Sequence, residues 1–243
     1  MIYAFIGMSL LFVAIGFIVT ENNAKYILAG YNTMSEEERK KIDLALYIPY
    51  FRKFHLFLGI SFFAIGVTVN YFMGKTAGGV FLGVYPILAY IYFIWNGTKY
   101  SKGLSPKTSK MAIFGLAITL IFVLTIIGLG FKNDRLSYTT QQIEIEGSYG
   151  EIIAASDLKA ISLVDNIPEI AYKANGFAIG AIRKGYFNTK EGERVKLIIN
   201  ADNKPYLLII KNDGSKIYFS PKEQNSELLL DELQQIYAAD LFK

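Results

Sequence analysis

Residues 111–131 read MAIFGLAITLIFVLTIIGLGF, a stretch without a single charged side chain. A bilayer core about 30 Å thick is crossed by roughly 20 apolar residues in a helix that rises about 1.5 Å per residue. Helices in the core of a soluble protein usually end sooner than this stretch does. Residues 111–131 therefore predict a transmembrane helix.

Three further apolar stretches precede it, at residues 2–20, 54–72 and 79–96. The first has neither the basic N-terminal region nor the small-x-small cleavage site of a secretory signal peptide, so a retained span is favoured over a cleaved leader. None of the four stretches contains Asp, Glu, Lys or Arg. We expect four transmembrane helices in the first half of the chain.

The charged residues are distributed unevenly between the two halves of the chain. Hydrophobic residues make up 52% of it, charged residues only 19%, and the mean hydropathy is +0.30. Residues 1–131 hold 11 basic and 5 acidic side chains, whereas the rest holds 14 basic and 16 acidic ones. This division predicts a four-helix transmembrane domain over residues 1–131, a linker over 132–139 and a soluble domain over 140–243.

The basic residues of the first half indicate the orientation. All except Lys75 lie in the two loops that join the first span to the second and the third to the fourth. Loops rich in Lys and Arg stay in the cytoplasm, so the soluble domain is predicted to be extracytoplasmic. Lys132 and Arg135, after the last span, point the other way. Because the excess charge lies beside the spans, the bilayer is the expected partner and nucleic acid is not.

The first cytoplasmic loop contains its own helix signal. Ser35 followed by Glu38 forms a capping box, with three glutamates in the first turn. A helix over about residues 36–47 is expected, ending before Pro49. A solvated helix beside the membrane is the favoured interpretation, and a cytoplasmic docking site is the alternative.

The same loop carries a resemblance. Ahead of the helix stand Gly30-Tyr31-Asn32-Thr33-Met34-Ser35, preceded by Ala29. An apolar span, this motif, an acidic-basic helix and a pair of spans together resemble an uncharacterised bacterial membrane family of unknown function. The resemblance covers about residues 1–100. It implies a bacterial origin, hence the cytoplasmic (inner) membrane, and it implies no chemistry.

The second half reads as short strands followed by a helix. Turn signals stand at Glu191-Gly192 and at Asn212-Asp213-Gly214. Ser220-Pro221, or alternatively Ser226, is expected to cap a terminal helix whose apolar stripe is Leu229, Leu230, Leu233, Ile236 and Tyr237. The predicted strands are Gln141–Glu146, Lys159–Val164, Glu169–Lys173, Phe177–Phe187, Arg194–Ile199, Tyr206–Lys211 and Ser215–Phe219.

Seven strands closed by one amphipathic helix match the layout of a pleckstrin-homology (PH)-like barrel. The domain also resembles bacterial PH-like domains in a set of glycines and aromatic residues that mark strand ends. The resemblance covers about residues 140–240 and implies a β-rich PH-like barrel with a C-terminal capping helix. The residues that carry it are Asn175, Gly176, Gly180, Gly185, Tyr186, Phe187, Gly192, Pro205, Tyr206, Gly214, Tyr218, Ser220 and Pro221.

No pattern of catalytic or ligand-binding residues is present. The chain lacks cysteine, and its one histidine, His55, is interpreted as an anchor at the cytoplasmic entrance of the second span. A Ser-His-Asp site in the soluble domain is therefore excluded, and no Ca²⁺-loop or phosphate-loop spacing occurs. We predict no catalytic, cofactor-binding or metal-binding residues, no cofactor and no enzymatic activity.

Two weaker signals are given structural interpretations. Arg183-Lys184, the only adjacent basic pair in the predicted strands, is interpreted as surface charge rather than a lipid headgroup site. Gly79-x-x-x-Gly83 is interpreted as a flexible turn entering the third span rather than a helix-packing motif. The absence of charged residues within the spans argues against an ion-coupled transporter.

The sequence therefore favours a non-enzymatic membrane protein that presents its PH-like domain to a protein or peptide whose identity the sequence does not specify. A hairpin of strands 206–211 and 215–219 is expected to offer the edge to which a partner strand binds. The alternative is an accessory or regulatory subunit of a membrane transporter or envelope complex, in which the spans themselves make the contact.

Overall fold

The computed structural model describes residues 1–100, 106–220 and 225–242. The chain forms two compact units, Met1–Thr125 and Ile126–Lys243, which we call the helical unit and the β unit.

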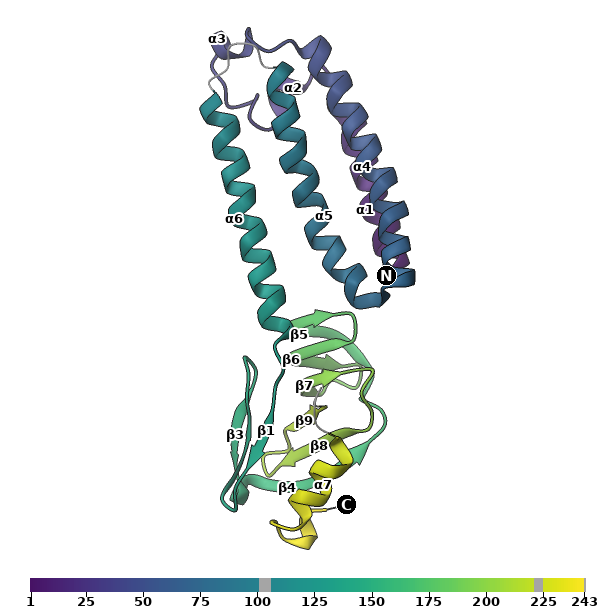
Figure 1. Ribbon diagram of the computed structural model, residues 1–243, viewed down its shortest axis with the longest axis vertical. Helices are drawn as coiled ribbons and strands as arrows, with labels where there is room; N and C mark the ends of the chain where they lie inside the picture. The colour runs from purple at the N-terminus through teal and green to yellow at the C-terminus, as the bar shows by residue number, and fades with distance from the viewer. Residues whose placement is uncertain (101–105, 221–224, 243) are drawn as a thin grey trace. The chain divides into compact units, whose positions relative to one another are not determined.

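Helices make up the first unit (Figure 1). Three helical stretches are long and apolar enough to cross a membrane, namely Leu44–Phe72, Gly74–Tyr100 and Ser109–Phe131, whereas Ile2–Ile18 is a shorter apolar helix. The expected apolar helices are thus all present. In chain order the elements are α1 (Ile2–Ile18), α2 (Ala24–Ile27), α3 (Glu36–Arg39), α4 (Leu44–Phe72), α5 (Gly74–Gly97), the 3₁₀ helix η1 (Thr98–Tyr100) and α6 (Pro106–Phe131).

The helix predicted over residues 36–47 is wrong in length. The capping box of Ser35 and Glu38 forms, but α3 ends at Arg39. A new helix, α4, begins after Asp43, whose side chain accepts a hydrogen bond from the Leu46 N–H. Pro49 lies inside α4 instead of stopping it. Proline at the sixth helical position removes only one backbone hydrogen bond, and burial of the residues that follow favours the longer helix.

Helices α1 and α4 run antiparallel in close contact. Ser9 Oγ donates to the Gly59 carbonyl over 2.6 Å. A Cβ atom at Gly59 would lie 2.6 Å from Val13 Cγ2, and one at Gly66 would lie 2.6 Å from the Phe5 ring. Glycine at these positions lets the two backbones approach, as it does in membrane helix pairs.

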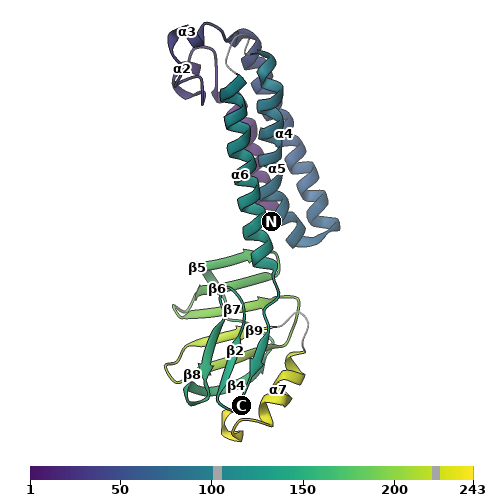
Figure 2. The same cartoon turned by 60° about the vertical axis from the view of Figure 1, so that its left-hand side comes forward.

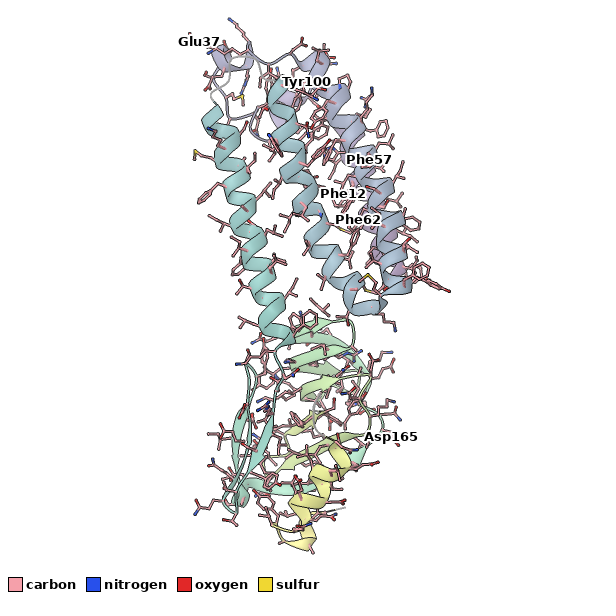
Figure 3. The ribbon with its side chains drawn as sticks, viewed as in Figure 1. Phe12, Glu37, Phe57, Phe62, Tyr100 and Asp165 are labelled. Atoms are coloured by element: carbon pink, nitrogen blue, oxygen red, sulfur yellow. The ribbon has the colours of Figure 1, made fainter. Side chains whose placement is uncertain are left out.

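Aromatic side chains fill the contact of these helices with α5. Phe12 and Phe62 meet edge to face at 5.3 Å between ring centroids, and both are buried, whereas Phe57 points away from the bundle (Figure 3). Tyr50 stacks on Phe93 at 5.1 Å and donates its hydroxyl proton to the Phe93 carbonyl over 2.8 Å. Aromatic packing therefore holds α1, α4 and α5 together.

The pair Gly79 and Gly83 does not form the predicted turn. Both glycines lie inside α5, and the tight turn falls at Gly74, whose φ is +84°. A Cβ atom at Gly83 would meet only Val123 of α6, at 3.8 Å. None of the described residues in the apolar window of α6 is buried.

The β unit contains two sheets and a terminal helix (Figure 2). The three-stranded sheet has the order β1 (Leu136–Tyr138), β2 (Gln142–Ile145), β3 (Glu151–Ala154). The six-stranded sheet has the order β4-β8-β9-β7-β6-β5, formed by β4 (Leu158–Val164), β5 (Ile170–Ile179), β6 (Ile182–Thr189), β7 (Arg194–Asn200), β8 (Tyr206–Lys211) and β9 (Lys216–Phe219).

Several strand predictions need correction. Strands β1 and β3 were not expected, and β1 occupies part of the residues predicted as a linker. The single strand predicted at 177–187 is instead a hairpin, because Ile179 pairs with Ile182 across Gly180-Ala181. Gly180 has a φ of +60°, which fits the first central position of a type II′ turn. The turns predicted at Glu191-Gly192 and Asn212-Asp213-Gly214 are confirmed.

The larger sheet is not shown to close into a barrel. Strand β7 pairs with β9 in parallel, and β8 inserts between β9 and β4. In the described part of the chain, β4 and β5 are the terminal strands of the sheet. The structure therefore has β sheets with a short C-terminal helix, but not the closed barrel expected from the PH-like layout.

Two apolar clusters lie on opposite faces of the larger sheet. Alternate residues of β7 point to opposite sides, and Leu197 belongs to one cluster whereas Ile198 belongs to the other. The larger cluster also includes the three-stranded sheet and helix α7 (Ser226–Gln234), which lies beside β4. Leu229, Leu233 and Tyr237 of the predicted stripe are buried, while Ile236 is exposed. The N-cap is Asn225, so the alternative cap Ser226 is instead the first helical residue. The first predicted cap, Ser220-Pro221, falls partly outside the described residues, which omit 221–224.

Candidate functional site

A cavity of about 540 Å³ lies inside the helical unit. Its wall is formed by α1, α4, α5 and the start of α6, and the segment 27–34 covers it. Pockets of this size commonly hold small organic ligands. Most of the wall is aliphatic or aromatic, as with Ile15, Tyr47, Phe51, Phe93 and Ile94.

Local backbone chemistry shapes the cover. Gly30 has a φ of +84°, and its carbonyl accepts a hydrogen bond from Thr33 Oγ1. Arg39 donates from Nε to the Tyr31 carbonyl over 3.1 Å and from its terminal nitrogen to the Asn32 carbonyl over 2.8 Å. A single guanidinium thus fixes the turn from which Tyr31 lines the cavity.

The capping box stabilises the helix that carries Arg39. The Ser35 backbone N–H and hydroxyl both donate to the Glu38 carboxylate, at 3.0 Å each. These hydrogen bonds, the backbone one first, lower the pKa of Glu38. The motif at residues 30–35, which carries the family resemblance, therefore forms part of the segment that covers the cavity.

His55 lies well inside α4 and is buried, whereas the sequence analysis placed it at the start of a span. It is 1% exposed, packs against Gly16 of α1, and lines the cavity. Its Nδ1 lies 2.8 Å from the Phe51 carbonyl, and its Nε2 lies 3.2 Å from the Tyr90 hydroxyl. The sequence placed His55 at a helix entrance because it assumed that α4 begins near residue 54, whereas α4 begins at Leu44.

The described residues that line the cavity include no Asp, Glu, Lys or Arg. Among all described residues, no group of three or more metal-ligating side chains is brought together. The cavity therefore provides shape, apolar surface and a few neutral polar groups. Those features suit binding of an uncharged molecule.

In the β unit, Lys184 is buried rather than a surface charge. Its ammonium group forms an ion pair with Asp134 and donates to the Lys132 carbonyl. Burial raises the pKa of Asp134, and the hydrogen bond and charge of Lys184 offset this only in part. Phe131 meets Phe177 of β5 edge to face at 5.5 Å. The residues after the last span are thus fastened to the sheet, and Lys184 is engaged inside the protein.

A second buried amine joins the two sheets. Lys196 of β7 pairs with Glu151 of β3, and Lys211 of β8 lies 3.2 Å from the same carboxylate. Burial alone would raise the pKa of Glu151, but the two ammonium groups outweigh it and the pKa is lowered. This arrangement is structural, because each charge has its partner within the fold.

The hairpin of β8 and β9 cannot offer the predicted free edge. Strand β8 is paired on both sides by β4 and β9, and β9 is paired on both sides by β7 and β8. On the outer side of β4, Ile161 forms a bridge with Phe242. Within the described residues of the six-stranded sheet, β5 is the terminal strand whose outer edge has no strand partner, and β1 and β3 are the terminal strands of the smaller sheet.

One comparison with known proteins identifies part of the chain. Residues 6–101 match the model of a protein family described as a domain of unknown function, DUF3784. Residues 6–101 are thus similar to DUF3784, and we call them the DUF3784 segment for short. The resemblance expected for about residues 1–100 agrees with this match, which covers less than half of the chain.

The DUF3784 segment contains every residue that lines the cavity except Ser109 and Ala112 of α6. No curated protein and no solved structure matches the chain. The comparisons thus add no support for a PH-like C-terminal domain.

Sequence reasoning missed the cavity altogether. Its signal was present as aromatic residues at helical spacing, Tyr47 with Phe51 on α4 and Tyr90 with Phe93 on α5. That spacing is equally typical of a solid helix contact. Only the three-dimensional packing distinguishes a filled contact from a lined cavity.

Proposed function

We propose that this chain is a non-enzymatic, multi-pass protein of the bacterial cytoplasmic membrane that presents its β unit to another protein or peptide at the membrane surface. The observation that carries the proposal is that no strand among the described residues pairs with the outer edge of β5. Phe177 of this strand packs against Phe131 in the last turn of α6. A partner strand bound there would be held next to the bilayer.

Four crossings are part of the proposal. Helix α1 has 17 residues, which lies at the lower limit of about 17–25 for a transmembrane helix. Its contacts with α4 extend from Gly16 beside Arg52 to Phe5 beside Gly66. Helix α1 lies along the apolar part of α4, which is long enough to cross the membrane. We therefore propose that α1 crosses the membrane as well.

Strand addition would use backbone hydrogen bonds of β5. Residues 171–175 are consecutively exposed, and Tyr172 is 60% exposed. Irregular register between Ile170 and Tyr172 and between Lys173 and Asn175 would disfavour indiscriminate pairing. A partner with matching side chains is therefore required.

We propose, in addition, that the strand layout of the β unit is related to that of a PH-like barrel. Short strands followed by a terminal amphipathic helix support it. The parallel pairing of β7 with β9 and the open strand order speak against a simple closed meander. Strand addition at β5 does not depend on this assignment.

The alternative is an accessory subunit whose spans make the partner contact. Helix α6 favours it, because none of the described residues in its apolar window is buried. Such a face suits either lipid or a helix of another protein.

A photo-crosslinking amino acid placed in the full-length protein distinguishes the two. The probe replaces Tyr172 on β5, Phe122 on α6 or Ile152 on β3, all of them exposed. In native membranes we expect one defined protein adduct from the Tyr172 position and none from the Ile152 control. An adduct from Phe122 alone would establish the alternative, and adducts of equal yield from Tyr172 and Ile152 would contradict strand addition.

A further inference from the structure

We infer that the cavity of the DUF3784 segment binds a neutral, chain-bearing lipid alcohol. The site lies in the helical unit and uses none of the residues of β5, so its test is independent of the crosslinking test.

The charge of the wall restricts the ligand first. The lining residues that the structure describes include no Asp, Glu, Lys or Arg. A carboxylate or phosphate placed against them would lose its hydration without gaining an ion pair, which disfavours its binding. These residues therefore favour an uncharged ligand.

The surface of the wall indicates a hydrocarbon chain. Rings of Tyr47, Phe51 and Phe93 and the side chains of Ile15 and Ile94 provide apolar contact area. On its α6 side the cavity is lined by Ser109 and Ala112, near the start of a helix whose apolar window has no buried residue among those described. With α6 in a bilayer, a ligand from the lipid phase reaches this side without crossing water.

The Tyr90 hydroxyl offers a hydrogen-bond acceptor to the ligand. A carbonyl can only accept, so Nδ1 of His55 carries the proton that bonds to the Phe51 carbonyl. The Nε2 atom of the neutral ring then accepts from the Tyr90 hydroxyl. The Tyr90 oxygen keeps a lone pair in the cavity wall and can accept from a ligand hydroxyl.

The motif at residues 30–35 turns backbone carbonyl groups outward and apolar side chains toward the cavity. Arg39 binds the outward carbonyls of Tyr31 and Asn32, while Tyr31 and Met34 line the cavity. The turn that the capping box fixes therefore closes the cavity on the side of the loop.

The test uses full-length protein in nanodiscs and a photoactivatable hexadecanol. Adducts are mapped by peptide mass spectrometry, and unlabelled hexadecanol, hexadecane and palmitate compete. We expect labelling of the cavity wall, competition by hexadecanol about five-fold better than by hexadecane, as one hydrogen bond provides, and the weakest competition by palmitate.

Two variants locate the site. Ile94→Trp fills the cavity and should abolish labelling of its wall. Tyr90→Phe, made in a His55→Leu background so that Nε2 is not left as a free acceptor, keeps the wall apolar and removes both acceptors, so hexadecanol and hexadecane should compete equally. Tyr92→Phe, an exposed position on the same helix, should keep the wild-type preference.

Ile94→Trp can also disturb helix packing. The Tyr90→Phe variant therefore tests the binding of the alcohol independently of the Ile94→Trp result. Full labelling in Ile94→Trp, an unchanged alcohol preference in Tyr90→Phe, or palmitate competing as well as hexadecanol would each overturn the inference.

Discussion

At the scale of single residues, the β unit contains two ammonium groups that are almost completely buried, those of Lys184 and Lys196. Each is neutralised by a carboxylate from a segment that the sequence analysis did not assign to a strand, Asp134 or Glu151. A buried charge without its partner is strongly destabilising, so these pairs fix how the segments around β1 and β3 lie on the larger sheet.

The Glu151 pair predicts a pH dependence of stability. Because the folded-state pKa of Glu151 is lowered, its contribution is present above its ordinary pKa and is lost as pH falls through the folded value. We expect Glu151→Gln to reduce the free energy of unfolding of the β unit by about 2 kcal/mol at neutral pH. The difference from wild type should vanish in acid.

Amide hydrogen exchange of β3 in full-length protein measures this difference at both pH values. Glu169→Gln is the matched control, because the Glu169–Lys190 pair is exposed and contributes about 0–1 kcal/mol. A loss in Glu151→Gln that persists unchanged in acid would rule out the ionic origin.

At the scale of elements, glycine decides which helices touch. Gly59 lies against backbone and side chain of α1, whereas a Cβ atom at Gly115 of α6 would meet nothing within 4 Å. The sequence contains both glycines in apolar stretches and does not distinguish them. Gly83, which did match a spacing rule together with Gly79, makes no comparable contact, because a Cβ atom there would meet only Val123 at 3.8 Å.

Alanine at these two positions should therefore act differently. We expect Gly59→Ala to lower the stability of the detergent-solubilised protein by about 1–3 kcal/mol, because the added methyl group meets the Ser9 carbonyl oxygen at 2.8 Å. Gly115→Ala should change it by no more than about 0.5 kcal/mol. Thermal unfolding followed by static light scattering measures both, and equal effects would show that α1 does not pack on α4 as described.

At the scale of the whole molecule, the uneven distribution of basic residues sets the expected sidedness. Ten of the eleven basic residues of the first half lie in residues 21–53 and 97–110, the two predicted loops that join the apolar stretches. If both loops are cytoplasmic and α1 crosses the bilayer, the β unit lies outside the cytoplasm.

Reporter fusions after Lys110 and after Lys243 measure this sidedness. We expect a cytoplasmic signal from the first and an extracytoplasmic signal from the second, because α6 lies between them. Matching signals at the two points would reject the orientation. Fusions after Lys75 provide the internal control and should agree with those after Lys243.

The sequence by itself determined the apolar helices, the division of charge, the capping box at Ser35 and two of the hairpin turns. Each depends on residues that are close in the chain, where helical rise, side-chain caps and glycine φ values act without tertiary context. The hairpin at Gly180 had a local signal too, but a continuous run of strand formers concealed it.

Tertiary structure alone decided the start of α4, the burial of His55, the interior position of β8 and β9, and the cavity. These features depend on contacts between residues far apart in the chain. The burial of Ile48 and Phe51 favours a helix through Pro49. Strand β7 pairs directly with β9 in parallel, although β8 lies between them in the chain. Whether aromatic side chains fill a helix contact or line a cavity is set by the distance between backbones, which no local pattern encodes.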